Sequence, residues 1–388
     1  MNVQSKPNVG AAQRHLPFES VALVLQGGGA LGAYQAGVYE ALAEAGIQPD
    51  WVSGVSIGAI NAAIIAGNAP NDRVDRLRTF WADITSGGPW PLFNDPFALP
   101  RGDAMRNLLN QMSAGLAVAS GASGFFAVRP LVPWLHPAGT IEATSFYDTA
   151  ALKRTLERLV DFDRLNAGMT RLSVGAVNVR TGNFVYFDSA DDTIRPEHVM
   201  ASGALPPGFP AVEIDGEHYW DGALVSNTPL QWVVESRPRR DTLAFQVDLW
   251  SARGELPRHM LEVMTREKEI RYSSRTRAGT DQFKHVQRLQ HAVAGLIDKL
   301  PDELKNSAEA KLLSTVAHRK VYSIVHLIYR ARNYEGHSKD YEFSRLSMKE
   351  HWRAGYHDAR RTLRHPEVLE RPDGEGVRTF DLVHDGRD

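Results

Sequence analysis

The sequence predicts an α/β fold in which helices cover a parallel sheet. Residues 21–26 form a short apolar run that ends in glycines and leads into a helical pattern from 30 to 45. A second apolar run at 50–56 leads into a helix of small residues from 57 to about 66. Two successive strand-helix units of this kind are typical of a covered parallel sheet, because each crossover helix packs on the strands that it connects.

Later runs extend this pattern. We expect two strands around a turn at Thr181-Gly182-Asn183, a core strand at 242–250 and another strand at 321–329. Long polar helices are expected at about 258–300 and near 344–363. The predicted sheet therefore draws strands from most of the chain.

The composition is that of an ordinary globular protein. The 388 residues are 43% hydrophobic and 23% charged, enough for one large domain or two modest ones. The net charge of -2 gives no overall drive toward nucleic acid, and the lack of cysteine excludes disulfides and thiolate chemistry. The first 20 residues lack the apolar stretch of a signal peptide, and no window approaches the roughly 18 apolar residues of a spanning helix. We therefore expect a cytoplasmic protein without a nucleic-acid partner.

The charge balance changes near residue 253. From there to 371, Lys and Arg outnumber Asp and Glu, whereas acidic residues are in excess in the rest of the chain. The predicted organisation is an N-terminal tail at 1–20, a main domain at 21–252 and a basic, largely helical region at 253–388. The basic region either makes a peripheral contact with anionic headgroups at the inner membrane surface or presents a solvated helical face. It is also a candidate for oligomer contacts.

The glycines after the first strand are spaced G-x-G-x-x-G, at Gly27, Gly29 and Gly32. This spacing is typical of a dinucleotide-binding turn, which holds a pyrophosphate at a helix N-terminus. Such a site also needs an acidic residue at the end of the second strand, where it binds the ribose hydroxyls. Asp50 has nearly the right spacing but precedes that strand, so a nucleotide site is disfavoured.

The second strand ends in GVSIG, which matches the nucleophile-elbow pattern G-x-S-x-G around Ser56. In such an elbow the serine lies on a sharp strand-to-helix turn, and the flanking glycines, here Gly54 and Gly58, avoid clashes. Parallel strands bring their carboxyl ends to one edge of a sheet, so N–H groups of the glycine loop would face an acyl oxygen bound to Ser56. A helix N-cap at Ser56 and a tight strand-helix turn at the glycines are the purely structural alternatives.

With a third motif, Asp221-Gly222-Ala223, the chain resembles the patatin-like phospholipases over about residues 21–249. That family combines a glycine-rich oxyanion loop, a G-x-S-x-G serine and a distant D-G-G or D-G-A aspartate. The resemblance implies a three-layer α/β/α fold with a mostly parallel central sheet, followed by a largely helical C-terminal region. The family commonly has Arg or Lys where this chain has Leu31, so a positive charge near the oxyanion is missing.

The resemblance also implies a Ser56–Asp221 catalytic dyad that acts without histidine, metal or cofactor. Ser56 would attack a lipid ester, Asp221 would act as base, and Gly27, Gly28 and Gly29 would donate N–H groups to the oxyanion. The expected protein is a serine acyl hydrolase of lipid degradation, a phospholipase or lipid esterase. The alternative function is an inactive lipid-binding protein on the same fold. Separately, the purely structural alternative for Asp221 is a turn at the Asp-Gly pair.

Residues 113–130 are rich in Ala, Gly and Ser. They are too weakly patterned to predict a helix and too apolar for a solvated linker, so a lid is one interpretation. This stretch and its continuation contain apolar side chains that suit either an acyl pocket or the ordinary core: Phe125, Phe126, Leu131, Trp134 and Leu135.

Overall fold

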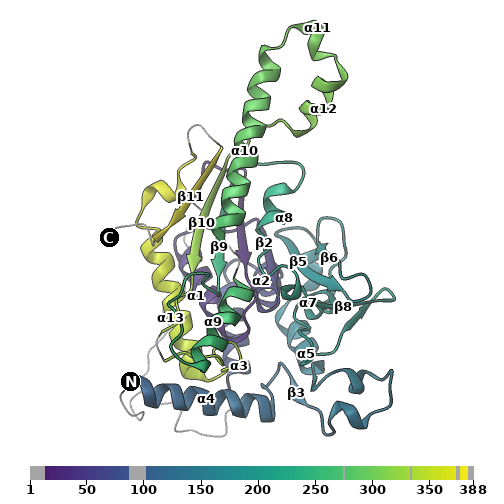
Figure 1. The fold of residues 1–388 in the computed structure, drawn as a ribbon, viewed down its shortest axis with the longest axis vertical. Helices are drawn as coiled ribbons and strands as arrows, with labels where there is room; N and C mark the ends of the chain where they lie inside the picture. Colours follow the sequence, from purple (N-terminus) through teal and green to yellow (C-terminus); the bar gives the residue numbers. More distant parts are fainter. Residues whose placement is uncertain (1–13, 87–101, 274–275, 333, 373–375, 383–388) are drawn as a thin grey trace.

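The computed structural model describes residues 14–86, 102–273, 276–332, 334–372 and 376–382, and its centre is a nine-stranded sheet between helices (Figure 1). The strands are β1 Ser20–Leu25, β2 Trp51–Val55, β3 Ala127–Val128, β4 Tyr147–Asp148, β5 Arg171–Asn178, β6 Phe184–Asp188, β7 Val212–Ile214, β8 Glu217–Asp221, β9 Thr242–Asp248, β10 Tyr322–Ile328 and β11 Val377–Asp381. The α-helices are α1 Ala33–Glu44, α2 Ile57–Ala66, α3 Arg73–Ile84, α4 Asp103–Ser120, α5 Ala150–Leu159, α6 Phe162–Asn166, α7 Pro196–Ser202, α8 Leu230–Glu235, α9 Met260–Tyr272, α10 Thr276–Lys299, α11 Asp302–Lys305, α12 Ala308–Val316 and α13 Arg345–Thr362.

Parallel pairs form most of the central sheet. Its strand order is β11-β10-β9-β1-β2-β5-β8-β7, and β6 also pairs with β5. Every pair from β11 to β5 is parallel, whereas β5–β6, β5–β8 and β7–β8 are antiparallel. The two strands predicted around the Gly182 turn are β5 and β6. The predicted mostly parallel sheet is therefore confirmed.

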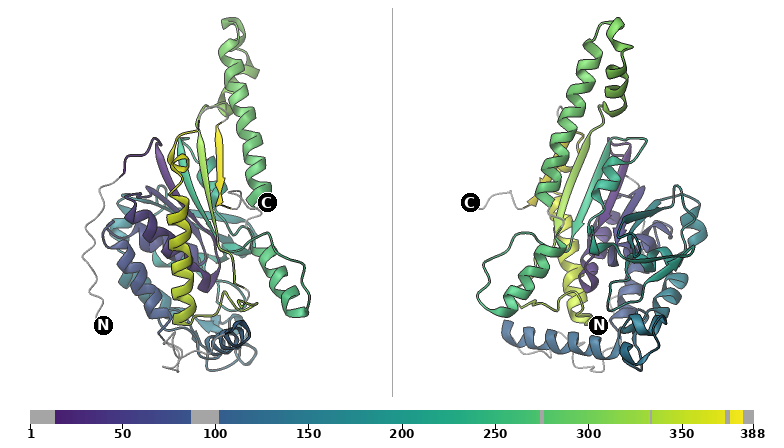
Figure 2. Two further views of the ribbon diagram at one scale, coloured as in Figure 1. Left: turned by 90° about the vertical axis from the view of Figure 1, so that its left-hand side faces the viewer. Right: turned by 45° about the vertical axis from the view of Figure 1, so that its right-hand side comes forward.

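Alternate side chains of the strands point into two different helix layers. In β1, Leu23 and Leu25 join the main core with α1, α2 and α3, whereas Ala22 and Val24 pack with α8 on the opposite face. α10 covers that second face farther along the sheet, where Phe283 packs edge-on against the first tyrosine of β10. Figure 2 shows these layers from two sides, and they confirm the α/β/α arrangement.

The region after residue 252 continues the same sheet. β10 and β11 pair in parallel beside β9, and α13 packs along α1 in the main core. α10 begins on the sheet and then runs past its edge; with α11 and α12 it forms an arm that projects from the body (Figure 1). In the part of the chain that the structure describes, no helix combines the length and apolarity needed to cross a bilayer.

The structure differs from the sequence prediction at the start of α1 and at the end of α4. The helix expected from residue 30 begins with a 3-10 turn, Gly29–Gly32, so that α1 starts at Ala33. Residues 113–120, where the pattern was too weak to predict a helix, form the last turns of α4. The small residues there hide the helical periodicity, but Ala has the highest helix propensity and so permits the helix to continue.

Candidate active site

Ser56 lies directly after β2 in a strained turn. Its φ of 56° and ψ of -126° are rare for a residue with a side chain, and α2 begins at the next residue. Its N–H donates to the hydroxyl of Ser202 over 3.0 Å. A Cβ on Gly54 would lie 2.3 Å from the carbonyl oxygen of Gly58, and one on Gly58 would lie 2.3 Å from that of Leu25. Close backbone contacts thus require both glycines, as in a nucleophile elbow.

Asp221 is the last residue of β8 and is only 1% exposed. Its Oδ1 accepts a hydrogen bond from the N–H of Ala223 over 2.8 Å. Its Oδ2 is buried and accepts no well-aligned hydrogen bond from the described residues. Burial therefore raises the pKa of Asp221 to about 7, although the nearby Ser56 hydroxyl and the Ala223 N–H both act to lower it. Such a carboxyl group can exchange a proton near neutral pH.

The glycine loop runs beside Ser56. A Cβ on Gly27 would lie 3.0 Å from the Cβ of Ser56. The N–H of Gly27 donates to the carbonyl oxygen of Asn227 over 3.3 Å, so this predicted oxyanion donor is already engaged. The N–H groups of Gly28 and Gly29 have no acceptor among the described residues. Two of the three predicted donors are therefore free to bind an oxyanion.

Buried side chains that we did not predict hold this loop in place. The Gln26 Oε1 accepts hydrogen bonds from the N–H groups of Leu249 (2.6 Å) and Trp250 (2.9 Å). The Nδ2 of Asn227 and the indole N–H of Trp250 both donate to the carbonyl oxygen of Gly27, over 3.1 and 3.0 Å. Gln26 at the end of an apolar strand was the sequence feature that could have predicted these contacts, because a polar side chain buried there needs hydrogen-bond partners.

The remaining residues of the glycine motifs have packing roles. A Cβ on Gly32 would lie 2.5 Å from the Cγ1 of Ile57, so this glycine lets the loop approach α2. A Cβ on Gly222 would similarly lie 2.6 Å from a β5 carbonyl oxygen. Leu31 is fully buried, so its apolar side chain belongs to the core. Asp50 accepts a hydrogen bond from the hydroxyl of Ser20 at the amino end of β1, away from the loop.

The five side chains suggested for an acyl pocket do not form one group. Phe125 and Phe126 are buried in an aromatic cluster of the core. Leu131, Trp134 and Leu135 are instead exposed, by 52%, 78% and 69%. The core alternative therefore holds for the two phenylalanines, whereas the other three side chains face solvent.

An open groove of about 2010 Å³ lies between α4, the segment 250–259, α9 and the end of β10. Trp250 lines this groove and also holds the carbonyl oxygen of Gly27. Ser56 and Asp221 are not among its lining residues. Within the described ranges, no cluster of three or more His, Asp or Glu side chains is arranged to hold a metal ion.

The family model of patatin-like phospholipases matches residues 23–232, which is more than half of the chain. The chain belongs to this family. A second family model, described as patatin phospholipase, matches residues 270–375, so the patatin match is not confined to the half of the chain that carries Ser56.

Individual relatives align with this patatin-like chain over short stretches. An uncharacterized NTE family protein of Mycobacterium tuberculosis is 35% identical over 121 residues, which is 31% of this chain and 20% of that protein. Lysophospholipase nte1 of Aspergillus terreus is 55% identical over 56 residues, which is 14% of this chain and 4% of that protein. The structure of VipD from Legionella pneumophila aligns with a TM-score of 0.39 and 14% identity, over 99% of this chain and 78% of that one.

Proposed function

We propose that this patatin-like chain is a serine acyl hydrolase that cleaves ester bonds of lipids, with Ser56 as nucleophile and Asp221 as base. The observation that carries the proposal is the strained Ser56 elbow beside a buried carboxyl group whose pKa is about 7. A carboxylate with this pKa is a stronger base than an ordinary aspartate, yet much of it is ionised at neutral pH. The family match and a relative named as a lysophospholipase support a lipid ester as substrate.

Acylation uses three groups of the site. The hydroxyl proton of Ser56 passes to the Asp221 carboxylate while Oγ bonds to the ester carbonyl carbon. The carbonyl oxygen becomes an oxyanion, which accepts hydrogen bonds from the N–H groups of Gly28 and Gly29. The bond to the alcohol then breaks, and the alcohol leaves with the proton from Asp221.

Deacylation repeats these roles with water. A water molecule gives a proton to Asp221 while its oxygen bonds to the carbonyl carbon of the acyl-Ser56 ester. The same two N–H groups stabilise the second oxyanion. The bond to Oγ then breaks, Oγ takes the proton from Asp221, and the fatty acid leaves. Asp221 ends as a carboxylate, ready for the next cycle.

We further propose that the chain meets its lipid as a peripheral protein of the cytoplasmic membrane surface. The exposed Leu131, Trp134 and Leu135 follow β3, at the end of the molecule toward which the parallel strands run (Figure 1). An exposed tryptophan suits a water–lipid interface, because its ring is apolar and its N–H is polar. By contrast, Lys268 and Lys339 of the basic region form ion pairs inside the protein and do not supply free charge for headgroups.

A fluorophosphonate probe tests the nucleophile. We expect covalent labelling of the wild-type chain at Ser56, because an activated hydroxyl beside oxyanion donors attacks phosphorus as it attacks an acyl carbon. Ser56→Ala should abolish labelling and reduce turnover of a p-nitrophenyl ester by several orders of magnitude. Ser120→Ala, at an exposed serine that ends α4, serves as the control and should label normally. Labelling that persists in Ser56→Ala, or lipid binding by a wild-type chain that never labels, would refute the hydrolase.

A further inference from the structure

A segment between β10 and α13, residues 334–342, lies across the glycine loop; we call it the strap. The carbonyl oxygen of Asp340 accepts a hydrogen bond from the N–H of Ala30 over 2.7 Å. A Cβ on Gly29 would lie 2.1 Å from the same oxygen. Gly29 also has a φ of 55°, which favours glycine. The backbones of the strap and the loop are therefore in direct contact, although the two segments lie near opposite ends of the sequence.

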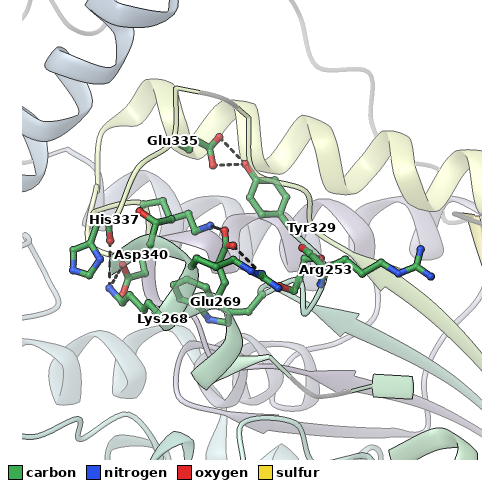
Figure 3. A network of polar contacts seen from close by, with 12 residues as sticks. Arg253, Lys268, Glu269, Tyr329, Glu335, His337 and Asp340 are labelled. Atoms are coloured by element: carbon green, nitrogen blue, oxygen red, sulfur yellow. Dashed lines mark hydrogen bonds and ion pairs between the residues drawn. The ribbon is translucent and has the colours of Figure 1, made fainter. Parts of the chain in front are cut away.

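α9 holds the strap through two crossed ion pairs. The Nζ of Lys268 lies 2.6 Å from the Oδ1 of Asp340, and the Nζ of Lys339 lies 2.5 Å from the Oε1 of Glu269. Figure 3 shows Lys268 pointing toward Asp340, with Glu269 beside them. The Lys339 side chain is only 3% exposed, and both acidic partners are below 20%. Charges withdrawn from water to this extent are costly to leave unpaired, so these contacts fix the strap more firmly than surface pairs would.

A second route leads from the same lysines to the glycine loop. The ammonium groups of Lys268 and Lys339 lie 5.7 and 5.2 Å from the ring centroid of Trp250. Cations at this distance are attracted to the indole face. The indole N–H of Trp250 in turn donates to the carbonyl oxygen of Gly27. The lysine pair therefore acts on the loop at Gly27 through Trp250 and at Ala30 through the strap.

The start of the strap is anchored independently. Both carboxylate oxygens of Glu335 lie 2.7 Å from the hydroxyl of Tyr329, at the end of β10. The Nε2 of His351, on α13, lies 3.5 Å from the Oε1 of Glu335. Figure 3 shows Glu335 and Tyr329 facing each other. The strap thus has one fixed point on the core and another on α9.

We propose that the strap and α9 position the oxyanion donors, with Lys268, Glu269, Lys339 and Asp340 as positioning residues. Gly28 and Gly29 lie between two held points, the carbonyl oxygen of Gly27 and the N–H of Ala30. Glycines adopt many backbone conformations, so free N–H groups on a glycine loop point in one direction only when both ends are held. Calling these groups oxyanion donors rests on the proposed function, whereas the ordering of the loop does not.

Lys268→Met tests this role, because it removes the cation and keeps most of the side-chain length. We expect amide hydrogen exchange in peptides covering residues 25–34 to become at least about tenfold faster. For a soluble ester, kcat should fall about 10- to 100-fold with KM nearly unchanged, because displaced donors act mainly on the oxyanion. Lys268→Arg should restore both. Lys320→Met, which breaks a Lys–Glu pair to Glu19 at the amino end of β1, is the control and should change neither.

Hydrogen exchange tests the ordering of the glycine loop independently of whether the chain hydrolyses esters. Faster exchange in Lys268→Met but not in Lys320→Met supports ordering of the glycine loop by the ion pairs, even if the wild-type chain hydrolyses no ester; in that case the proposed function fails and the ordering of the loop stands. Unchanged exchange of the loop in Lys268→Met overturns it, whatever the activity. Equal changes in the two variants also overturn it, since they would indicate a general loss of stability.

Discussion

The pKa values of two buried aspartates, Asp188 and Asp221, are shifted in opposite directions. Burial alone would raise the pKa of Asp188, but hydrogen bonds from Arg171, Ser173 and Trp232 outweigh burial and lower it. Asp221 lacks such a set of donors, so burial prevails and its pKa rises to about 7. Asp188 is thus held as an anion at neutral pH, whereas Asp221 can exchange a proton there.

Asp221→Asn should stabilise the fold in a pH-dependent way. The unfolded chain releases the Asp221 proton near the ordinary pKa of 3.8, whereas the folded chain releases it near 7. The wild type therefore loses stability as the pH rises from about 4 to 7, by at most about 4 kcal/mol. The variant has no such proton, so its advantage in urea unfolding should be near zero at pH 4 and largest at pH 8.

Asp188→Asn provides the opposite control. Because the folded pKa of Asp188 is lowered, its carboxylate stabilises the wild type above the ordinary pKa of 3.8, and this stability is lost as the pH falls through the folded pKa. Asp188→Asn should therefore be less stable than the wild type at pH 8. A stability difference for Asp221→Asn that stays constant between pH 4 and pH 8 would contradict the raised pKa of Asp221.

Among the elements, α1 and α13 make an unusually close contact. A Cβ on Gly37 would lie 1.9 Å from the carbonyl oxygen of Trp352, and one on Gly355 would lie 2.0 Å from that of Tyr34. A glycine on each helix thus lets the two backbones approach. Since α1 directly follows the glycine loop, the C-terminal helix α13 is part of the support beneath the candidate site.

Gly355→Ala should destabilise the protein by about 1–3 kcal/mol or more, because the added methyl group overlaps a backbone carbonyl that cannot move freely. Gly295→Ala is the matched control in α10, where a Cβ would meet nothing within 4 Å. That change should stabilise the protein by up to about 1 kcal/mol through helix propensity. Urea unfolding of both variants checks the prediction, and similar effects of the two substitutions would rule out the close contact.

At the scale of the whole molecule, the two ends differ. The parallel strands run toward the end where α4 and β3 lie, whereas the arm of α10, α11 and α12 projects from the other end (Figure 1). Ser56 directly follows one of these strands, β2, and so belongs to the first end. Both ends carry exposed leucines: Leu135 is 69% exposed and Leu312 is 70% exposed. If lipid meets the site end, these equally exposed side chains should differ in their effect on binding.

Leu135→Ser should weaken sedimentation with vesicles of mixed zwitterionic and anionic lipids by about tenfold, because burying a leucine contributes about 1.5–3 kcal/mol. Leu312→Ser on the arm should leave vesicle binding unchanged. Equal losses in both variants, or a loss only in Leu312→Ser, would place the lipid contact elsewhere than the segment after β3.

Local sequence patterns predicted the elements whose burial is continuous. The helix expected at 57 to about 66 is α2, and the apolar runs at 21–26 and 242–250 are β1 and β9. A strand buried on both faces is mostly apolar, even where it carries buried polar residues such as Gln246 and Asp248 of β9, so its signal is present within six or seven residues. β8 has no such signal, because its residues EHYWD form a strand only through pairing with β5 and β7.

The sequence by itself determined the family, the mostly parallel sheet and the elbow at Ser56. These depend on apolar runs and on glycines that turns require, and such features are encoded within a few neighbouring residues. Only the tertiary structure decided which loop N–H groups are free, how deeply Asp221 is buried and what holds the loop. Contacts such as that of Asp340 with Ala30 join groups far apart in the chain. The residues around each group contain no pattern that predicts its partner, because the two groups come together only when the sheet and both helix layers have assembled.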